Sequence, residues 1–176
     1  MTPQDALQRA QMRLSNEGFE FLPNAASGNF LSAARRSRFE ISKFGNFEVF
    51  FVFVRLDRPD IPTVQTYSAN AFQYALNNKK FGLPCGFFEA VCCYPVALVE
   101  WTDPGLAAFM RNETPPKHWS AFEMPVVWNV AQDELYCLEK TPIWGAAYYS
   151  SFRKQAYAIL GRGAEGMAYA AGVSGT

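Results

Sequence analysis

Residues 47–57 read Phe47-Glu48-Val49-Phe50-Phe51-Val52-Phe53-Val54-Arg55-Leu56-Asp57, a run of aromatic and β-branched residues with few polar interruptions. Such a run is typical of a β-strand buried on both faces, because a strand with one solvated face alternates apolar and polar residues. Two later segments, residues 94–101 and 124–130, have the same character. The sequence therefore predicts a sheet built around these strands and covered by helices.

Four segments have the pattern of helices that pack on such a sheet. They are residues 3–17, 66–78, 104–111 and 151–160. Thr2 and Pro3 give the first helix a cap followed by proline, and Asp103 and Pro104 start the third in the same way. The last helix is expected to be capped by Ser150 or Ser151.

The remaining pattern favours antiparallel pairing. Residues 30–41 predict a strand that turns at Gly45-Asn46 into the central one, and residues 19–22 predict a short strand before it. Residues 135–138 follow the apolar strand of residues 124–130 after a polar turn, which predicts a hairpin. The expected fold class is α+β, with a central, mainly antiparallel sheet of four to six strands and about four packed helices.

The chain has the length of one domain. Its 176 residues can bury a core that needs no disulfide or metal. The sequence has no internal repeat and no second apolar core. We expect a single α+β domain over residues 1–160 and a flexible tail rich in glycine and alanine over residues 161–176.

Composition and charge narrow the classes of function. Lys and Arg number 16, as do Asp and Glu, so no net charge attracts nucleic acid or an anionic membrane. The first residues lack the pattern of a secretory signal peptide, and no apolar run reaches the roughly 18 residues of a membrane span. These features predict a cytoplasmic protein with no membrane segment, for which nucleic-acid binding is disfavoured.

The cysteines and the single histidine offer one route to catalysis. Cys92 and Cys93 are adjacent in an expected strand, so their side chains should point to opposite faces and suit neither a shared metal nor an ordinary disulfide. His118 is a candidate base for a thiol, or a metal ligand together with Glu123. No local signature of a known cysteine nucleophile surrounds Cys85, Cys92, Cys93 or Cys137, and buried, reduced thiols are the alternative interpretation.

Carboxylates offer a second route to catalysis, that of a small metal-dependent hydrolase or nuclease. The candidate residues are Asp57, Asp60, Glu139 and Lys140, which this function requires in one polar cleft. Nucleases of the restriction-endonuclease type place an Asp and then a Glu-x-Lys on adjacent strands. Here Lys140 directly follows Glu139, which turns the two side chains to opposite faces of a strand. This class is kept as the alternative function.

A basic group lies on the expected strand of residues 30–41. Arg35, Arg36 and Arg38 are crowded together and are candidate ligands for phosphates. Acidic residues such as Glu40 are interleaved with them, and charges at a sheet edge also prevent pairing with another chain. Both interpretations remain open.

Aromatic loops flank the expected hairpin, in residues 119–125 and 140–149. Loop aromatics beside proline and glycine are difficult to explain by core packing alone. The candidate binding residues are Trp119, Phe122, Trp144, Tyr148 and Tyr149. A concave patch of these side chains would suit a protein partner or a small planar ligand, and the alternative is that they cap an aromatic core.

The sequence contains no motif with a specific chemical mechanism, so it does not decide whether the chain is an enzyme. The favoured hypothesis is a small, soluble binding or protein-interaction protein without catalysis. It would use the aromatic loops around Trp119 and Trp144 and the arginines of residues 35–38. This hypothesis calls for neither a metal nor another cofactor.

Overall fold

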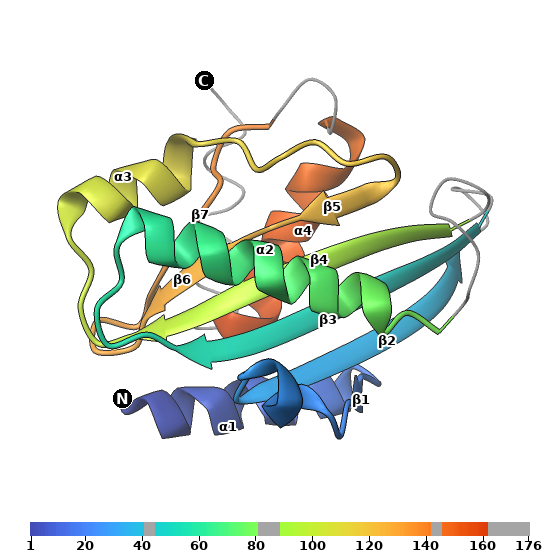
Figure 1. The fold of residues 1–176 in the computed structure, drawn as a ribbon, viewed down its shortest axis with the longest axis horizontal. Coiled ribbons are helices and arrows are strands. Elements are labelled where there is room, and N and C mark those ends of the chain that lie inside the picture. The colour runs from blue at the N-terminus through green and yellow to red at the C-terminus, as the bar shows by residue number, and fades with distance from the viewer. Residues whose placement is uncertain (41–44, 81–88, 142–145, 162–176) are drawn as a thin grey trace.

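The computed structural model describes residues 1–40, 45–80, 89–141 and 146–161, which form four α-helices and one seven-stranded sheet (Figure 1). The helices are α1 (Pro3–Asn16), α2 (Ile61–Asn77), α3 (Pro104–Asn112) and α4 (Ala146–Leu160). The strands are β1 (Glu20–Phe21), β2 (Ser32–Glu40), β3 (Gly45–Arg55), β4 (Glu89–Val99), β5 (Ala121–Glu123), β6 (Val126–Asn129) and β7 (Glu134–Cys137). A short 3-10 helix, η1 (Ala25–Gly28), precedes β2.

The sheet is mixed, in the order β1-β2-β3-β4-β6-β7, with β5 paired to β4. The pairs β1/β2, β2/β3 and β6/β7 are antiparallel, whereas β4 runs parallel to β3, β5 and β6. The predicted α+β class with about four helices is confirmed, but the sheet has more strands than the four to six predicted and is not mainly antiparallel. The reason is α2, because a helix between two apolar strands allows a parallel crossover.

The two central strands are buried on both faces, as the apolar run of residues 47–57 predicts. Phe50, Phe51, Val52 and Phe53 of β3 have no exposed surface. Their side chains alternate between two separate core clusters, one on each face of the sheet.

A proline explains why the strand beside β4 is divided into β5 and β6. On that side, β4 pairs with β5 as far as Cys93 and with β6 from Val96 onward. Pro95 lies between the two and has no N–H to donate to a sheet ladder. On the adjacent segment, Pro125 lies in the matching gap between β5 and β6. The predicted strand of residues 124–130 therefore begins at Val126.

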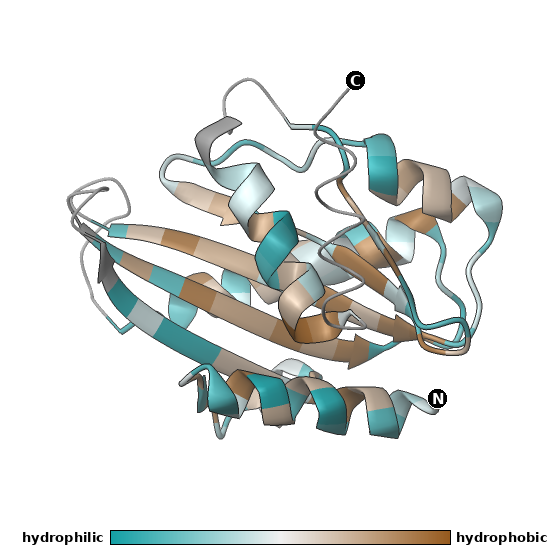
Figure 2. Ribbon diagram, turned by 180° about the vertical axis from the view of Figure 1, so that it is seen from behind, coloured by the Kyte–Doolittle hydropathy of each residue, from teal (hydrophilic) through white to brown (hydrophobic). Residues whose placement is uncertain are grey.

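Helices cover both faces of the sheet. α2 and α3 cross the face seen in Figure 1, whereas α4 and α1 lie on the opposite face, which Figure 2 shows from behind. Cys92 belongs to the core under α1 and α4, and Cys93 belongs to the core under α2 and α3. The prediction that these two thiols point to opposite faces is therefore confirmed.

Caps define the helix starts. The Thr2 hydroxyl accepts a hydrogen bond from the Asp5 amide at 3.1 Å, and the Asp103 side chain accepts from the amide of Leu106 at 3.0 Å. α2 begins at Ile61 rather than residue 66, because Asp60 caps it and a proline is tolerated in the first turn. α4 begins at Ala146, so the predicted cap at Ser150 or Ser151 is wrong.

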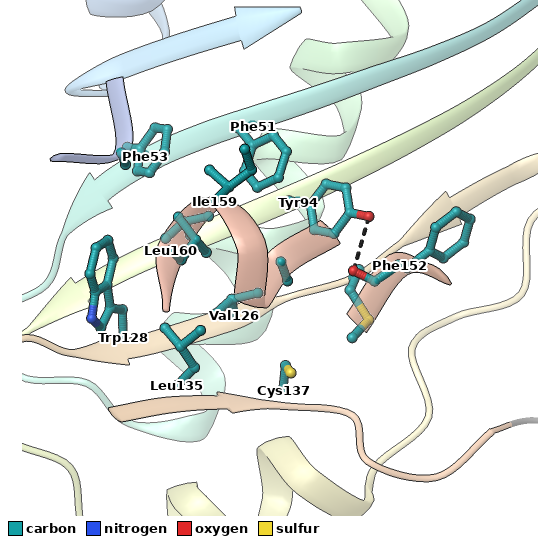
Figure 3. Close-up of a cluster of buried hydrophobic side chains, with 14 of the residues drawn as sticks. Phe51, Phe53, Tyr94, Val126, Trp128, Leu135, Cys137, Phe152, Ile159 and Leu160 are labelled. Atoms are coloured by element: carbon teal, nitrogen blue, oxygen red, sulfur yellow. Dashed lines mark hydrogen bonds between the residues drawn. The ribbon is translucent and has the colours of Figure 1, made fainter. Parts of the chain in front are cut away.

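An aromatic cluster anchors α4 to the sheet (Figure 3). The ring of Tyr94 stacks on Phe51 of β3 with centroids 4.3 Å apart. Its hydroxyl lies 3.2 Å from the carbonyl oxygen of Phe152 and 2.9 Å from Oε1 of Gln155, both on α4. Such stacked and hydrogen-bonded rings fix the height and rotation of a helix on a sheet.

The predicted turn at Gly45-Asn46 is wrong, because both residues belong to β3, where they pair with Glu40 and Phe39 of β2. The predicted tail beyond Gly161 lies outside the described residues. Within the described ranges, every helix is too short or too polar to cross a bilayer.

Candidate functional site

A cavity of about 320 Å³ lies between α2 and α3. Val64 and Ser68 of α2 line one side, Met110 of α3 lines the other, and Glu123 of β5 contributes to the wall. The segment after α3, which includes Pro115, also contributes to the lining. The cavity is therefore mostly apolar, with a small polar group on the sheet side.

Glu123 supplies a buried carboxylate to this cavity. It pairs with Cys93 of β4, and its side chain therefore lies on the face that α2 covers. The side chain is 5% exposed. Its Oε2 atom accepts a hydrogen bond from the hydroxyl of Ser68 at 2.9 Å, and its Oε1 atom lies 2.6 Å from Nε2 of His118.

His118 is held between the sheet and α2. Its ring stacks on Phe72 of α2, with centroids 4.2 Å apart and an angle of 24° between the planes. The side chain is 32% exposed, so the imidazole connects the buried Glu123 carboxylate to solvent. A protonated His118 forms an ion pair with Glu123, and a neutral His118 can still donate one hydrogen bond.

The order of these groups differs from that of a serine hydrolase. In a Ser-His-acid triad, the histidine lies between the serine and the carboxylate and takes the serine proton. Here Glu123 lies between Ser68 and His118, and the Ser68 hydroxyl donates to the carboxylate. The arrangement thus presents a fixed carboxylate acceptor in an apolar cavity rather than an activated hydroxyl.

The described cysteines do not contribute a reactive thiol. Cys92, Cys93 and Cys137 are buried. Burial raises the pKa of the Cys93 thiol well above its usual value and raises the pKa of Cys137 to about 12. These two thiols are protonated at neutral pH and are poor nucleophiles. Cys85 lies outside the described residues.

The carboxylates of the alternative function do not meet in one cleft. Asp57 and Asp60 follow the end of β3, and Asp60 caps α2. Glu139 follows β7, which is separated from β3 by β4 and β6, and it pairs with Arg111 at 3.1 Å. Lys140 adjoins it and is exposed. Among the described residues, no three His, Cys, Asp or Glu side chains are grouped as a metal site requires.

The aromatic candidates divide between surface and core. Trp119 is 80% exposed, in the segment between α3 and β5. Phe122 and Tyr149 are buried, and Tyr148 is partly buried, with its ring 4.9 Å from that of Phe122. Trp144 lies outside the described residues. Of the described aromatic candidates, Trp119 is the one that presents its ring to solvent.

The three arginines do not form one patch. Side chains alternate along β2, so Arg35 points to the face of α2, where it donates to the carbonyl oxygen of Asn78 at 2.8 Å. Arg36 and Arg38 point to the opposite face, and both line a cavity beside α4.

Sequence reasoning identified part of the polar group at the α2–α3 cavity. It named His118 and Glu123 as possible metal ligands, and the structure places them in contact. It missed Ser68, which lies 55 residues from Glu123 along the chain. In the sequence, Ser68 is a serine beside the apolar stripe of a helix. Such serines are too common for this one to be identified as a site residue.

Comparisons with protein-family models, with curated proteins and with solved structures found no match to this chain.

Proposed function

We propose that this protein binds a small organic ligand in the cavity between α2 and α3, with an apolar body and a cationic or hydrogen-bond-donating head group directed at Glu123. The observation that supports this proposal is the nearly buried Glu123 carboxylate in the wall of a mostly apolar cavity. A buried charge is costly unless it is paired, so proteins retain one where it serves a purpose. Apolar pockets with a few placed polar groups are the usual form of small-molecule sites.

The size and charge of the cavity narrow the class of ligand that it can bind. A volume of about 320 Å³ suits a compact molecule of roughly one ring with a short substituent. Glu113 also lines the cavity, so it contributes a second carboxylate. A protonated His118 would offset the charge of Glu123 and leave that of Glu113. A cation is therefore favoured over an anion of the same shape.

Three probes that share one ring test this proposal: cyclohexylmethylamine, cyclohexylmethanol and cyclohexanecarboxylate. We expect calorimetric titration to rank their affinities in that order, and the amide signals of Ser68 and Ala69 to shift in NMR spectra. Glu123→Gln should lower the affinity for the amine by tenfold or more, since a charged hydrogen bond is worth about 1.5–3 kcal/mol.

The matched control is Glu100→Gln, which removes the same charge from an exposed side chain just beyond β4. It should leave the affinity for the amine unchanged. Equal affinities for the three probes, or an unchanged affinity in Glu123→Gln, would contradict the proposal.

A second candidate function, contact with a protein partner, is favoured by the exposure of Trp119. Tryptophan is enriched among the residues that dominate binding energy at interfaces. Trp101 is also exposed and supplies a matched control on another loop. A partner that is captured by the wild type and by Trp101→Ala but not by Trp119→Ala supports this candidate, and equal capture by both variants contradicts it.

A further inference from the structure

We propose a second binding site, for a phosphate group or a similar compact anion, between β2, β3 and α4. It lies on the face of the sheet opposite to the α2–α3 cavity and does not depend on the function proposed above. A cavity of about 200 Å³ is present there. Arg36 and Arg38 of β2 line one side, and Ser151 and Gln155 of α4 line the other.

Arg36 is a nearly buried cation whose Nε–H has no acceptor. Its side chain is 10% exposed, and its guanidinium lies over the ring of Phe19 at 4.4 Å. Its Nη1 atom donates to the carbonyl oxygen of Glu17 at 2.7 Å and to the Glu17 carboxylate at 2.9 Å. Its Nε atom is buried without a hydrogen-bond partner. A buried N–H without an acceptor is unfavourable, and an anion in the cavity would supply one.

Arg38 and Gln155 add to the polar side of the cavity. Arg38 is two residues from Arg36 on the same face of β2, and it is exposed, so it brings a second positive charge to the entrance. Oε1 of Gln155 lies 2.9 Å from the Tyr94 hydroxyl, which leaves the NH₂ group of Gln155 to donate elsewhere. The hydroxyl of Ser151 donates to the carbonyl oxygen of Tyr148.

The balance of charge and size selects the ligand. No carboxylate is found among the described residues that line this cavity. The nearby Glu17 carboxylate accepts from Nη1 of Arg36 and not from its Nε atom. The rings of Phe47 and Phe152, with centroids 6.1 Å apart, give the cavity an apolar wall. Two guanidinium groups and an amide suit phosphate oxygens, and the volume suits inorganic phosphate or a small phosphate monoester.

The side chain of Arg36 gives a direct readout. The Nε–Hε signals of the arginines are recorded by NMR while the protein is titrated with inorganic phosphate. A parallel titration with sodium chloride, at the same ionic strength, is the reference. The Arg36 signal, assigned by its loss in Arg36→Lys, should shift saturably with phosphate. Arg38→Gln should weaken this binding about fivefold or more, because it removes one of two cations.

Arg58→Gln is the control, since it removes the same charge from an exposed side chain beyond the other end of β3. It should leave phosphate binding unchanged.

Phenyl phosphate tests whether the natural ligand is an organic phosphate monoester or free phosphate. Tighter binding than inorganic phosphate assigns the site to a monoester, and equal or weaker binding assigns it to free phosphate. An Arg36 signal that responds to neither anion more than to chloride overturns the proposal, as does equal weakening by Arg58→Gln and Arg38→Gln.

Discussion

The carboxylate of Glu123 lies 2.6 Å from the imidazole of His118, and this contact ties β5 to the segment that precedes it. β5 pairs with β4 over three residues. The Ser68 hydroxyl connects the same carboxylate to α2, so helix, strand and loop meet at one buried charge. This contact therefore fixes a wall of the α2–α3 cavity as well as supplying its polar group.

Ser68→Ala should destabilise the protein by about 1–3 kcal/mol, because it leaves an oxygen of the buried Glu123 carboxylate without its hydroxyl donor. The free energy of unfolding, measured by urea titration at pH 7, checks this value. Ser150→Ala, an exposed position on α4, is the matched control and should stay within about 0.5 kcal/mol of the wild type. Similar losses in the two variants would contradict a structural role for the Ser68 hydroxyl.

Asp133→Ala should cost about 2–3 kcal/mol, because Asp133 combines two polar contacts with an unusual backbone conformation. Its carboxylate accepts from Arg9 at 3.0 Å and from the indole N–H of Trp128 at 3.1 Å. Its φ is 54°, a region that Asp and Asn tolerate better than Ala does. Asp133→Asn should therefore lose less, about 1 kcal/mol. Guanidinium denaturation checks both values, and equal losses would contradict a contribution from the backbone conformation.

Two Tyr→Phe substitutions should differ in their effect on stability. Tyr94→Phe removes a hydroxyl that contacts α4, and should cost about 1–2 kcal/mol. The hydroxyl of Tyr74 is buried without a hydrogen-bond partner, so Tyr74→Phe should be neutral or stabilising by up to about 1 kcal/mol. Thermal and urea unfolding of the two variants side by side check this difference. A loss in Tyr74→Phe equal to that in Tyr94→Phe would contradict it.

The parts of the fold that local physics decides were predictable from the sequence. The run of residues 47–57 fits no other setting than a doubly buried strand, and β3 is that strand. Thr2 and Asp103 cap helices where the pattern places them. The hairpin of β6 and β7 follows from two apolar segments and a polar turn, and it is confirmed.

The parts that depend on distant partners were not predictable. An apolar strand carries no sign of the direction of its neighbour, so the parallel pairing of β4 with β3 was missed. His118 and Glu123 are five residues apart, and a local pattern can suggest them. Ser68 reaches Glu123 across 55 residues, and only the packing of α2 on the sheet brings it there.

The free energy of unfolding should fall as the pH rises from about 9 to about 12, in part because of Cys137. Its thiol has an ordinary pKa of 9.0, which burial raises to about 12. Within this window the unfolded chain loses the proton that the folded chain keeps, so stability decreases by up to about 1.4 kcal/mol per pH unit for this thiol. Cys137→Ala should reduce the slope of stability against pH by that amount, as measured by urea titration. Val126→Ala, which removes a buried side chain from the paired position on β6, should keep the wild-type slope. Identical slopes in the wild type and Cys137→Ala would show that this thiol titrates in the folded protein as it does in the unfolded chain.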